Sequence, residues 1–185
     1  INPNDGPNGG PPNEDYTVGL STLRDANIPM VGYVQTDFGA RPLAQVKADI
    51  DLYNLHYNIN GIFLDEASNQ SSDLAYYEEL YNYIKSLPNQ DTVILNPGTN
   101  TAEAYLNQPA SDIVMVLDDT ASAWSAFTPN AYMAAYPADR FAIAIYNVPS
   151  VTALQAAIDL AKERNVGYVY FTDDIAPNPW DTLPT

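Results

Sequence analysis

The 185-residue sequence predicts an α/β fold of the (β/α)8 TIM-barrel type, because short apolar runs alternate with helix-like segments along the whole chain. The apolar runs are nearly continuous and rich in Val, Ile, Tyr and Phe, which is typical of parallel strands covered on both faces. No internal repeat and no interdomain linker interrupts the alternation. We therefore expect residues 1–185 to form a single domain.

Six apolar runs that end in polar residues are expected to form the strands. A further strand end is indicated by Ile1-Asn2-Pro3, since the same apolar-Asn-Pro pattern recurs at Leu95-Asn96-Pro97. The six predicted strands are residues 30–36, 60–66, 91–96, 111–118, 141–146 and 166–172.

Between these runs, apolar residues recur every three or four positions, which is the period of a helix with one buried face. Pro42 suits a first helical turn, where its missing N–H leaves no bond unmade. Ser72 and Ser150 are predicted N-caps, because their hydroxyl oxygens can accept from the first free amides of a helix. The predicted helices are residues 14–26, 42–58, 72–87, 101–107, 121–135 and 150–164.

The length of the chain leaves two interpretations of this alternation. A (β/α)8 barrel usually has about 250 residues and rarely fewer than about 200, so this chain is shorter by about one strand and one helix. Either the first βα unit of a barrel is missing from this sequence, or the fold is an open α/β sheet. We favour the barrel that lacks its first βα unit.

The composition excludes several classes of function. With 7 basic and 23 acidic residues the formal net charge is −16, so neither nucleic acid nor an anionic membrane surface is an expected partner. There is no Cys, and the single His56 lies within a predicted helix, which argues against disulfides, zinc sites and a Ser-His-Asp triad. No apolar run approaches the ~20 residues of a membrane span. We expect a monomer with no metal and no cofactor.

Polar residues at the ends of the predicted strands are the candidates for chemistry, because active sites of α/β folds lie at the carboxyl ends of strands. Acidic residues follow four of the seven ends. An Asp in such a place often caps the next helix, and for Asp37 or Asp173 this explanation is as good as a functional one. It fits Asp65-Glu66 less well, since they directly follow an apolar run. The candidate residues at strand ends are Asn2, Thr36, Asp65, Glu66, Asn96, Asp118, Asp119, Tyr146 and Asp173.

Carboxylates flanked by aromatic residues indicate glycoside hydrolysis, which needs one carboxyl as acid/base and another as nucleophile or base. Adjacent residues of a strand point to opposite sides, so Asp65 and Glu66 cannot face each other if both are in the strand. We therefore expect the partner of Asp65 from another strand, with Asp118 as the best candidate. Aromatic side chains near strand ends could stack on sugars or simply pack in the core; these are Tyr33, Trp124, Tyr146 and Trp180.

Taken together, several short motifs in this order resemble the spherulin-4 family. Members of that family begin with one more strand before the Asn-Pro segment, which agrees with the missing βα unit. The motifs are INP at 1–3, GP at 6–7, VGYVQT at 31–36, GIFLDE at 61–66, YVYFTDD at 168–174 and NPWDTLP at 178–184.

The resemblance implies a secreted or membrane-anchored (β/α)8 glycoside hydrolase that cleaves α-1,4-linked galactosamine or N-acetylgalactosamine polymers internally. It places the family's acidic pair on Asp65 and Glu66 and a further Glu on or beside Asp118, where this sequence has Asp118-Asp119. We expect Asp65 as nucleophile, Asp118 as general acid/base and Glu66 as a supporting carboxylate. The polysaccharide is cationic if partly de-N-acetylated, and the protein extracellular or cell-wall associated. The alternative is a non-catalytic polysaccharide-binding or cell-surface structural protein with a degenerate site.

Overall fold

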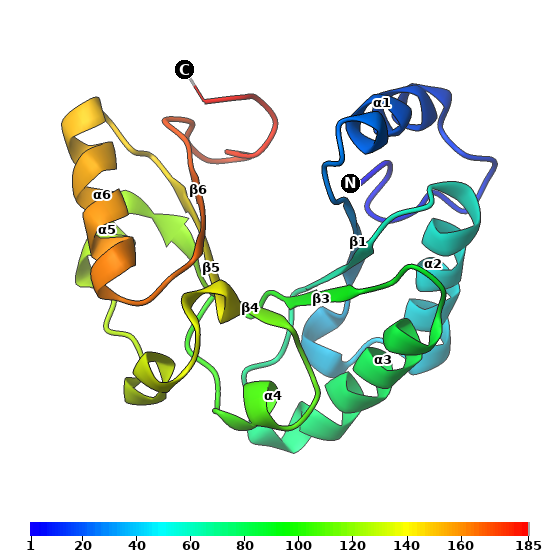
Figure 1. Ribbon diagram of the computed structural model, residues 1–185, viewed down its shortest axis with the longest axis horizontal. Helices are drawn as coiled ribbons and strands as arrows, with labels where there is room; N and C mark the ends of the chain where they lie inside the picture. Colours follow the sequence, from blue (N-terminus) through cyan, green and yellow to red (C-terminus); the bar gives the residue numbers. More distant parts are fainter. Residues whose placement is uncertain (185) are drawn as a thin grey trace. The chain divides into compact units, whose positions relative to one another are not determined.

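The computed structural model describes residues 1–184 and has six parallel strands with helices between them, which confirms the predicted α/β class. The chain divides into two compact units (Figure 1). Unit 1 consists of Ile1–Asn96 and Ala102–Asp112, and unit 2 of Pro97–Thr101 and the chain from Ile113 onward. Closure into a barrel and the missing first βα unit stay predictions.

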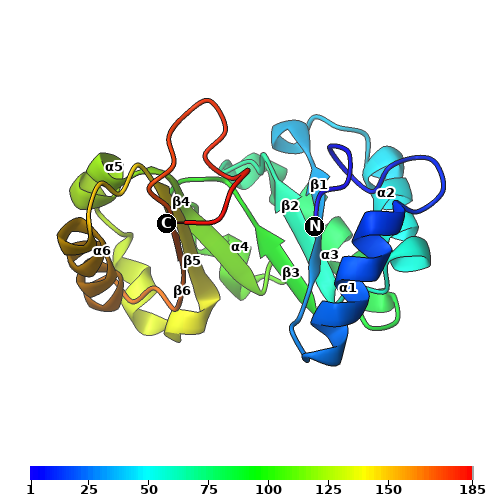
Figure 2. The same cartoon turned by 90° about the horizontal axis from the view of Figure 1, so that it is seen from above.

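Unit 1 contains three parallel strands in chain order, with β1 paired to β2 and β2 to β3. Figure 2 shows α1, α2 and α3 on the same side of these strands. The elements of unit 1 are α1 (Glu14–Asp25), β1 (Val31–Gln35), α2 (Leu43–His56), β2 (Gly61–Asp65), α3 (Leu74–Ser86), β3 (Thr92–Leu95) and α4 (Ala104–Asn107).

Burial alternates along β1 and along the second half of β2, because α2 and α3 cover only one face of these strands. The side chains of Val34 and Leu64 lie on the face that the helices cover and are fully buried. The side chains of Tyr33, Gln35 and Asp65 lie on the opposite face and are half-buried. The sequence predicted strands covered on both faces. The opposite face of β1 and β2 therefore carries polar side chains that solvent can reach.

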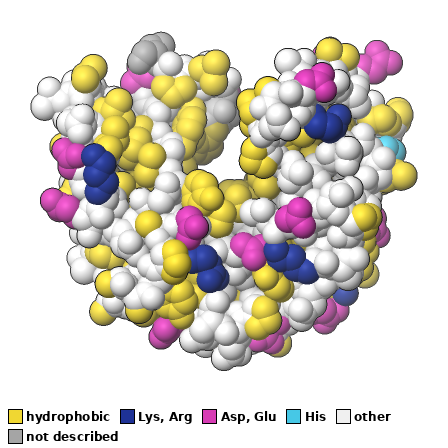
Figure 3. Space-filling view, viewed as in Figure 1, with side chains coloured by type: hydrophobic (Ala, Val, Ile, Leu, Met, Phe, Trp, Pro, Cys, Tyr) yellow, Lys and Arg dark blue, Asp and Glu magenta, His cyan; other side chains and the backbone are white. Residues whose placement is uncertain are grey.

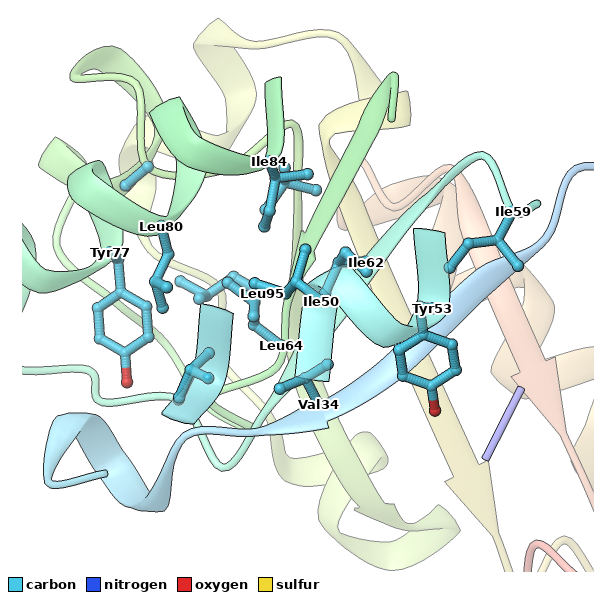
Figure 4. Close-up of a cluster of buried hydrophobic side chains, with 14 of the residues drawn as sticks. Val34, Ile50, Tyr53, Ile59, Ile62, Leu64, Tyr77, Leu80, Ile84 and Leu95 are labelled. Carbon is cyan, nitrogen blue, oxygen red and sulfur yellow. The ribbon is translucent and has the colours of Figure 1, made fainter. Parts of the chain in front are cut away.

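The core of unit 1 lies between the strands and the two long helices (Figure 4). Ile50 and Tyr53 of α2 and Leu80 of α3 are fully buried there against the strands. Gly32 of β1 leaves the space that the Tyr53 ring fills, because a Cβ at this position would lie 2.7 Å from two ring carbons. A side chain at position 32 would therefore force the Tyr53 ring to shift.

Unit 2 repeats the alternation with β4 paired to β5 and β5 to β6, all parallel. Trp124 of α5 is fully buried and donates from Nε1 to the carbonyl oxygen of Ala157 in α6, at 3.1 Å, which joins the two helices. The elements are β4 (Ile113–Thr120), α5 (Ala121–Ala126), β5 (Phe141–Tyr146), α6 (Val151–Glu163) and β6 (Tyr168–Phe171).

The structure corrects three local predictions. The helix expected at 121–135 is two pieces, α5 and a 3-10 turn at Ala131–Ala135, since Pro129 between them cannot donate a helical hydrogen bond. Ser72 lies in a 3-10 turn before α3 and is not its N-cap, whereas Ser150 does cap α6, where its Oγ accepts from the amide of Ala153. The strand predicted to end at Asp118 continues to Thr120.

The first residue lies along β1. The amino nitrogen of Ile1 donates to the carbonyl oxygen of Val31 at 2.5 Å, and the amide of Tyr33 donates to the carbonyl oxygen of Ile1 at 2.9 Å. These two bonds have the pattern of a parallel ladder. The backbone at Ile1 therefore follows β1 as the predicted strand end would, although no strand is assigned there.

Candidate active site

The turn after β2 holds the predicted acid pair. The strand ends at Asp65, and Glu66 follows with φ = 47°, in the left-handed region that costs a residue with a side chain roughly 1–2 kcal/mol. Two hydrogen bonds to the Glu66 carbonyl oxygen hold this conformation, from the amide of Phe38 at 2.7 Å and from Thr36 Oγ1 at 2.8 Å. Strained backbone of this kind occurs preferentially at functional sites.

The left-handed turn brings the Glu66 carboxylate to the same face of the sheet as Asp65. Gln35 is the register partner of Asp65 in the neighbouring strand, so these two side chains share one face. Nε2 of Gln35 donates to Oε2 of Glu66 at 2.6 Å, which places the second carboxylate beside that face. Asp65 and Glu66 would point to opposite sides only if both were in the strand. Glu66 lies after the end of β2, so the two carboxylates can share one side.

Two donors orient the Asp65 carboxylate. Nδ2 of Asn96, a buried side chain directly after β3, donates to Oδ1 of Asp65 at 2.7 Å. The Tyr33 hydroxyl is also hydrogen-bonded to Asp65. The pKa of Tyr33 is raised well above its usual value, mainly by burial and then by the charge of Asp65 and this hydrogen bond. The charges of Asp5 and Glu66 add to the effect. The Tyr33 phenol is therefore a donor at all ordinary pH values.

An aromatic pair lies on the same face as the carboxylates. Tyr33 and Phe63 are register partners of β1 and β2, and their rings stack with centroids 6.3 Å apart and planes inclined by 21°. Both side chains are half-buried. The face of β1 and β2 thus combines apolar rings with carboxylates and amides, which is the composition that a sugar ring requires.

Two predicted substrate-binding residues lie in the core instead. Thr36 is fully buried, and its hydroxyl donates to the carbonyl oxygens of Asp65 and Glu66. It therefore supports the backbone of the acid pair from the buried side. Trp124 is fully buried between α5 and α6 and cannot stack on a sugar. Asn2 is exposed, but its Oδ1 accepts from the amide of Gly6 at 2.7 Å and closes a turn.

The remaining predicted residues belong to unit 2. Asp118 and Asp119 are half-buried within the last part of β4, and Oδ1 of Asp119 accepts from the amide of Thr120. Tyr146 at the end of β5 is half-buried, and its ring packs perpendicular to the Trp180 ring with the two centroids 5.8 Å apart. Asp173 is exposed after β6, where it helps to line a cavity of about 260 Å³.

Three contributors to the site were missed by sequence reasoning. Gln35 and Phe63 follow from period-2 alternation, because they lie two residues from Tyr33 and Asp65 on the same strands. Asp5 faces Tyr33 closely enough to affect its pKa, but it comes from the Gly- and Pro-rich start of the chain, where no periodicity exists.

The surface charges and the helices of the described residues point to no other kind of site. On the face drawn in Figure 3, acidic side chains are spread out, some beside Lys or Arg, rather than gathered in one patch. Within residues 1–184 no group of three His, Cys, Asp or Glu side chains could hold a metal ion. None of the helices in that range has the length and apolar character needed to cross a membrane.

The similarities to known proteins extend over 95% or more of this chain. The chain is 35% identical to spherulin-4 of Physarum polycephalum over 184 residues, which is 95% of this chain and 55% of the relative, so it spans about half the relative's length. The crystal structure of Aspergillus clavatus Sph3 in complex with GalNAc has the same fold, with a TM-score of 0.83 and 24% identity over 100% of this chain and 79% of that one. The sequence profile described as Spherulation-specific family 4 matches residues 1–185. The chain belongs to the spherulation-specific family 4.

Proposed function

We propose that the protein is an endo-acting glycoside hydrolase that cleaves a polysaccharide of α-1,4-linked galactosamine or N-acetylgalactosamine. The observation that carries the proposal is the acid pair: Asp65 and Glu66 lie beside one face of the sheet, next to the Tyr33–Phe63 ring stack. Carboxylates next to aromatic rings are what glycoside hydrolysis requires.

The choice of sugar rests on relatives. Sph3, which shares the fold, was crystallised with GalNAc. Family membership and the resemblance of the sequence motifs point in the same direction. An amino-sugar polymer is therefore the first substrate to test.

We assign Asp65 the role of nucleophile, because Asn96 and Tyr33 both donate to its carboxylate and fix its orientation. Glu66 supports the site as a second negative charge held by Gln35. Asp118 is the proposed general acid/base. A nucleophilic Asp65 makes the enzyme a retaining one, which requires about 5 Å between the two carboxyl groups instead of about 6.5–9.5 Å.

A specific feature favours the second candidate function, a non-catalytic polysaccharide-binding protein. The family pattern implies a further Glu on or beside position 118, and this chain has Asp118 and Asp119 there. A carboxyl group displaced by one methylene, more than 1 Å, can lower a rate by roughly 100-fold.

The test is the release of reducing ends from α-1,4-galactosaminan and its N-acetylated form. Wild-type protein is compared with Asp65→Asn and Asp118→Asn, and with the surface variant Asp159→Asn of α6 as the matched control. We expect losses of ~100-fold or more in kcat for the first two and no change for the control. Equal activity of Asp65→Asn and wild type contradicts the proposal. Binding of the polymer without turnover by wild type supports the second candidate.

The remaining parts of the proposal concern the setting of the enzyme. We propose an extracellular or cell-wall-associated monomer that takes a polysaccharide as its partner. Size-exclusion chromatography with light scattering tests the oligomeric state, and fractionation of the source cells tests the location.

A further inference from the structure

A chain of hydrogen-bonded hydroxyl groups, here called the hydroxyl chain, lies on the buried side of the acid pair Asp65 and Glu66. The amide of Ser68 donates to the Tyr77 oxygen at 2.7 Å, and the Tyr77 oxygen lies 3.1 Å from Thr36 Oγ1. The Thr36 hydroxyl in turn donates to the carbonyl oxygens of Asp65, at 3.0 Å, and of Glu66, at 2.8 Å. Because the one Thr36 hydroxyl proton goes to these carbonyls, Tyr77 must be the donor to Thr36.

The chain lies in the core and remains intact over the ordinary pH range. Thr36 and Tyr77 are both fully buried. Burial raises the pKa of the Tyr77 phenol, so it keeps the proton that it donates. The far end is tied to α3, since Ser68 Oγ donates to Oδ2 of Asp73 at 2.6 Å. Buried hydroxyl groups with all their partners form a rigid unit.

This unit holds the backbone of two neighbouring turns in left-handed conformations. Glu66 has φ = 47° after β2, and Asp37 and Phe38 have φ = 48° and 51° after β1. The amide of Phe38 donates to the carbonyl oxygen of Glu66, the same oxygen that accepts from Thr36. The hydroxyl chain and the strained turns therefore converge on one carbonyl group.

The direction of the Glu66 carboxylate depends on this conformation. If Glu66 continued the extended backbone of β2, its side chain would point to the face opposite Asp65. The left-handed turn instead lets it accept from Gln35 beside the face that carries Asp65. Whatever holds the Glu66 backbone thus decides whether the two carboxylates act at one place.

We propose that Tyr77 and Thr36 are positioning residues of the hydrolase, whose hydroxyl groups hold Glu66 in the left-handed turn and so bring its carboxylate beside Asp65. The inference rests on the proposed function for its effect on turnover, but the effect on the backbone stands without it.

The kinetic test uses substitutions that remove only hydroxyl groups. Tyr77→Phe and Thr36→Val break the chain, whereas Thr36→Ser keeps the hydroxyl. Tyr81→Phe is the matched control, since it lies one turn further along α3 and loses a hydrogen bond to Asp112, away from the acid pair. In Tyr77→Phe and Thr36→Val we expect kcat on the galactosaminan polymer to fall about 10- to 100-fold and KM to change less than about 3-fold. We expect a kcat near that of wild type in Thr36→Ser and no change in Tyr81→Phe.

Hydrogen exchange supplies a measurement that needs no activity. The Phe38 amide reports on the bond to the Glu66 carbonyl, and we expect its exchange to accelerate at least about 10-fold in Tyr77→Phe and Thr36→Val. The Asn60 amide just before β2, which donates to the carbonyl oxygen of Met30 at 2.7 Å, corrects for overall stability. If one of these two variants fails to fold, the other decides the test, and Thr36→Ser is the control for which wild-type exchange at Phe38 is expected.

The two proposals fail in different ways. An inactive wild type refutes the hydrolase and leaves exchange at Phe38 to decide on the hydroxyl chain. An active wild type whose Tyr77→Phe and Thr36→Val variants keep full kcat refutes the positioning role. Unchanged exchange at Phe38 in both variants refutes the inference in either case.

Discussion

Gln35 and Glu66 meet through a hydrogen bond of 2.6 Å, although one residue ends β1 and the other follows β2. The Gln35 amide thereby compensates part of the Glu66 charge beside the face that carries Asp65. This single contact joins the two turns from the solvent side, opposite the buried hydroxyl of Thr36.

The first prediction concerns this contact. Replacing Gln35 by Met keeps the length of the side chain and removes the donor, so the Glu66 carboxylate loses its partner. We expect kcat on the galactosaminan polymer to fall about 10- to 100-fold, because misplacement of a catalytic group by about 1 Å has effects of this size. Gln45→Met, on the exposed side of α2, is the control and is expected to match wild type. Wild-type kcat in Gln35→Met contradicts the prediction.

The second prediction concerns stability in alkali. Burial raises the pKa of several tyrosines, to about 12 for Tyr76 and Tyr105. In the unfolded chain these phenols ionise near pH 10, where the folded protein still holds the protons, so the stabilisation is complete below about pH 10 and is lost as the pH rises towards the folded pKa. The midpoint of urea unfolding should therefore fall steeply above about pH 10.

Absorbance of tyrosinate follows the same titration. Tyr105→Phe removes one buried phenol, whose hydroxyl donates to the carbonyl oxygen of Gln70, and should make the alkaline loss of stability less steep. A flat dependence of the wild-type midpoint between about pH 9 and about pH 11 would show that burial does not hold these protons.

The third prediction concerns the packing of Gly32 against Tyr53. Gly32→Ala places a methyl group 2.7 Å from the ring carbons and should lower the free energy of unfolding by about 1–3 kcal/mol. Gly19→Ala is the matched control, because a Cβ there meets nothing within 4 Å in α1 and should stabilise the protein by about 0.5–1 kcal/mol. Chemical denaturation measures both, and equal signs for the two variants would refute the packing argument.

The fourth prediction concerns salt. With a formal net charge of −16, the protein should attract a de-N-acetylated, cationic polymer at long range. Raising NaCl from about 20 mM to about 500 mM should lower kcat/KM on that polymer about 10-fold, because salt screens this attraction, and leave kcat/KM on the fully N-acetylated polymer nearly constant. The same salt dependence on both polymers contradicts electrostatic attraction of the substrate.

The sequence was sufficient for the strands and for the acid pair. Apolar runs that end in polar residues located six strands, and strand ends marked Asp65, Glu66 and Asn96, which the structure brings together. Parallel strands align their carboxyl ends, so residues far apart in the chain meet by this rule alone. Gln35 could have been predicted from the two-residue alternation of side chains along a strand, since it lies two positions from Tyr33.

Features that depend on backbone angles or on contacts between helices were not predictable from spacing. Nothing in the pattern marks Glu66 as left-handed, because Glu is not a residue typical of positive φ. Trp124 was expected to contact substrate because it follows a strand end, but its ring is fully buried, with Nε1 bonded to the carbonyl oxygen of Ala157 in α6 and the Arg164 guanidinium over the ring. β4 continues beyond its predicted end at Asp118, because Asp118 and Asp119 still pair with Ala144 and Ile145 of β5.

The left-handed Glu66 also bears on the history of the chain. Glycine adopts this conformation without steric cost, and Asn tolerates it better than Glu does. A protein that had no use for the carboxylate would therefore gain stability by drifting to Gly or Asn at this position. Glu66 therefore stands at a position that its own backbone disfavours, and use of its carboxylate at the site explains why a residue with this cost is found there.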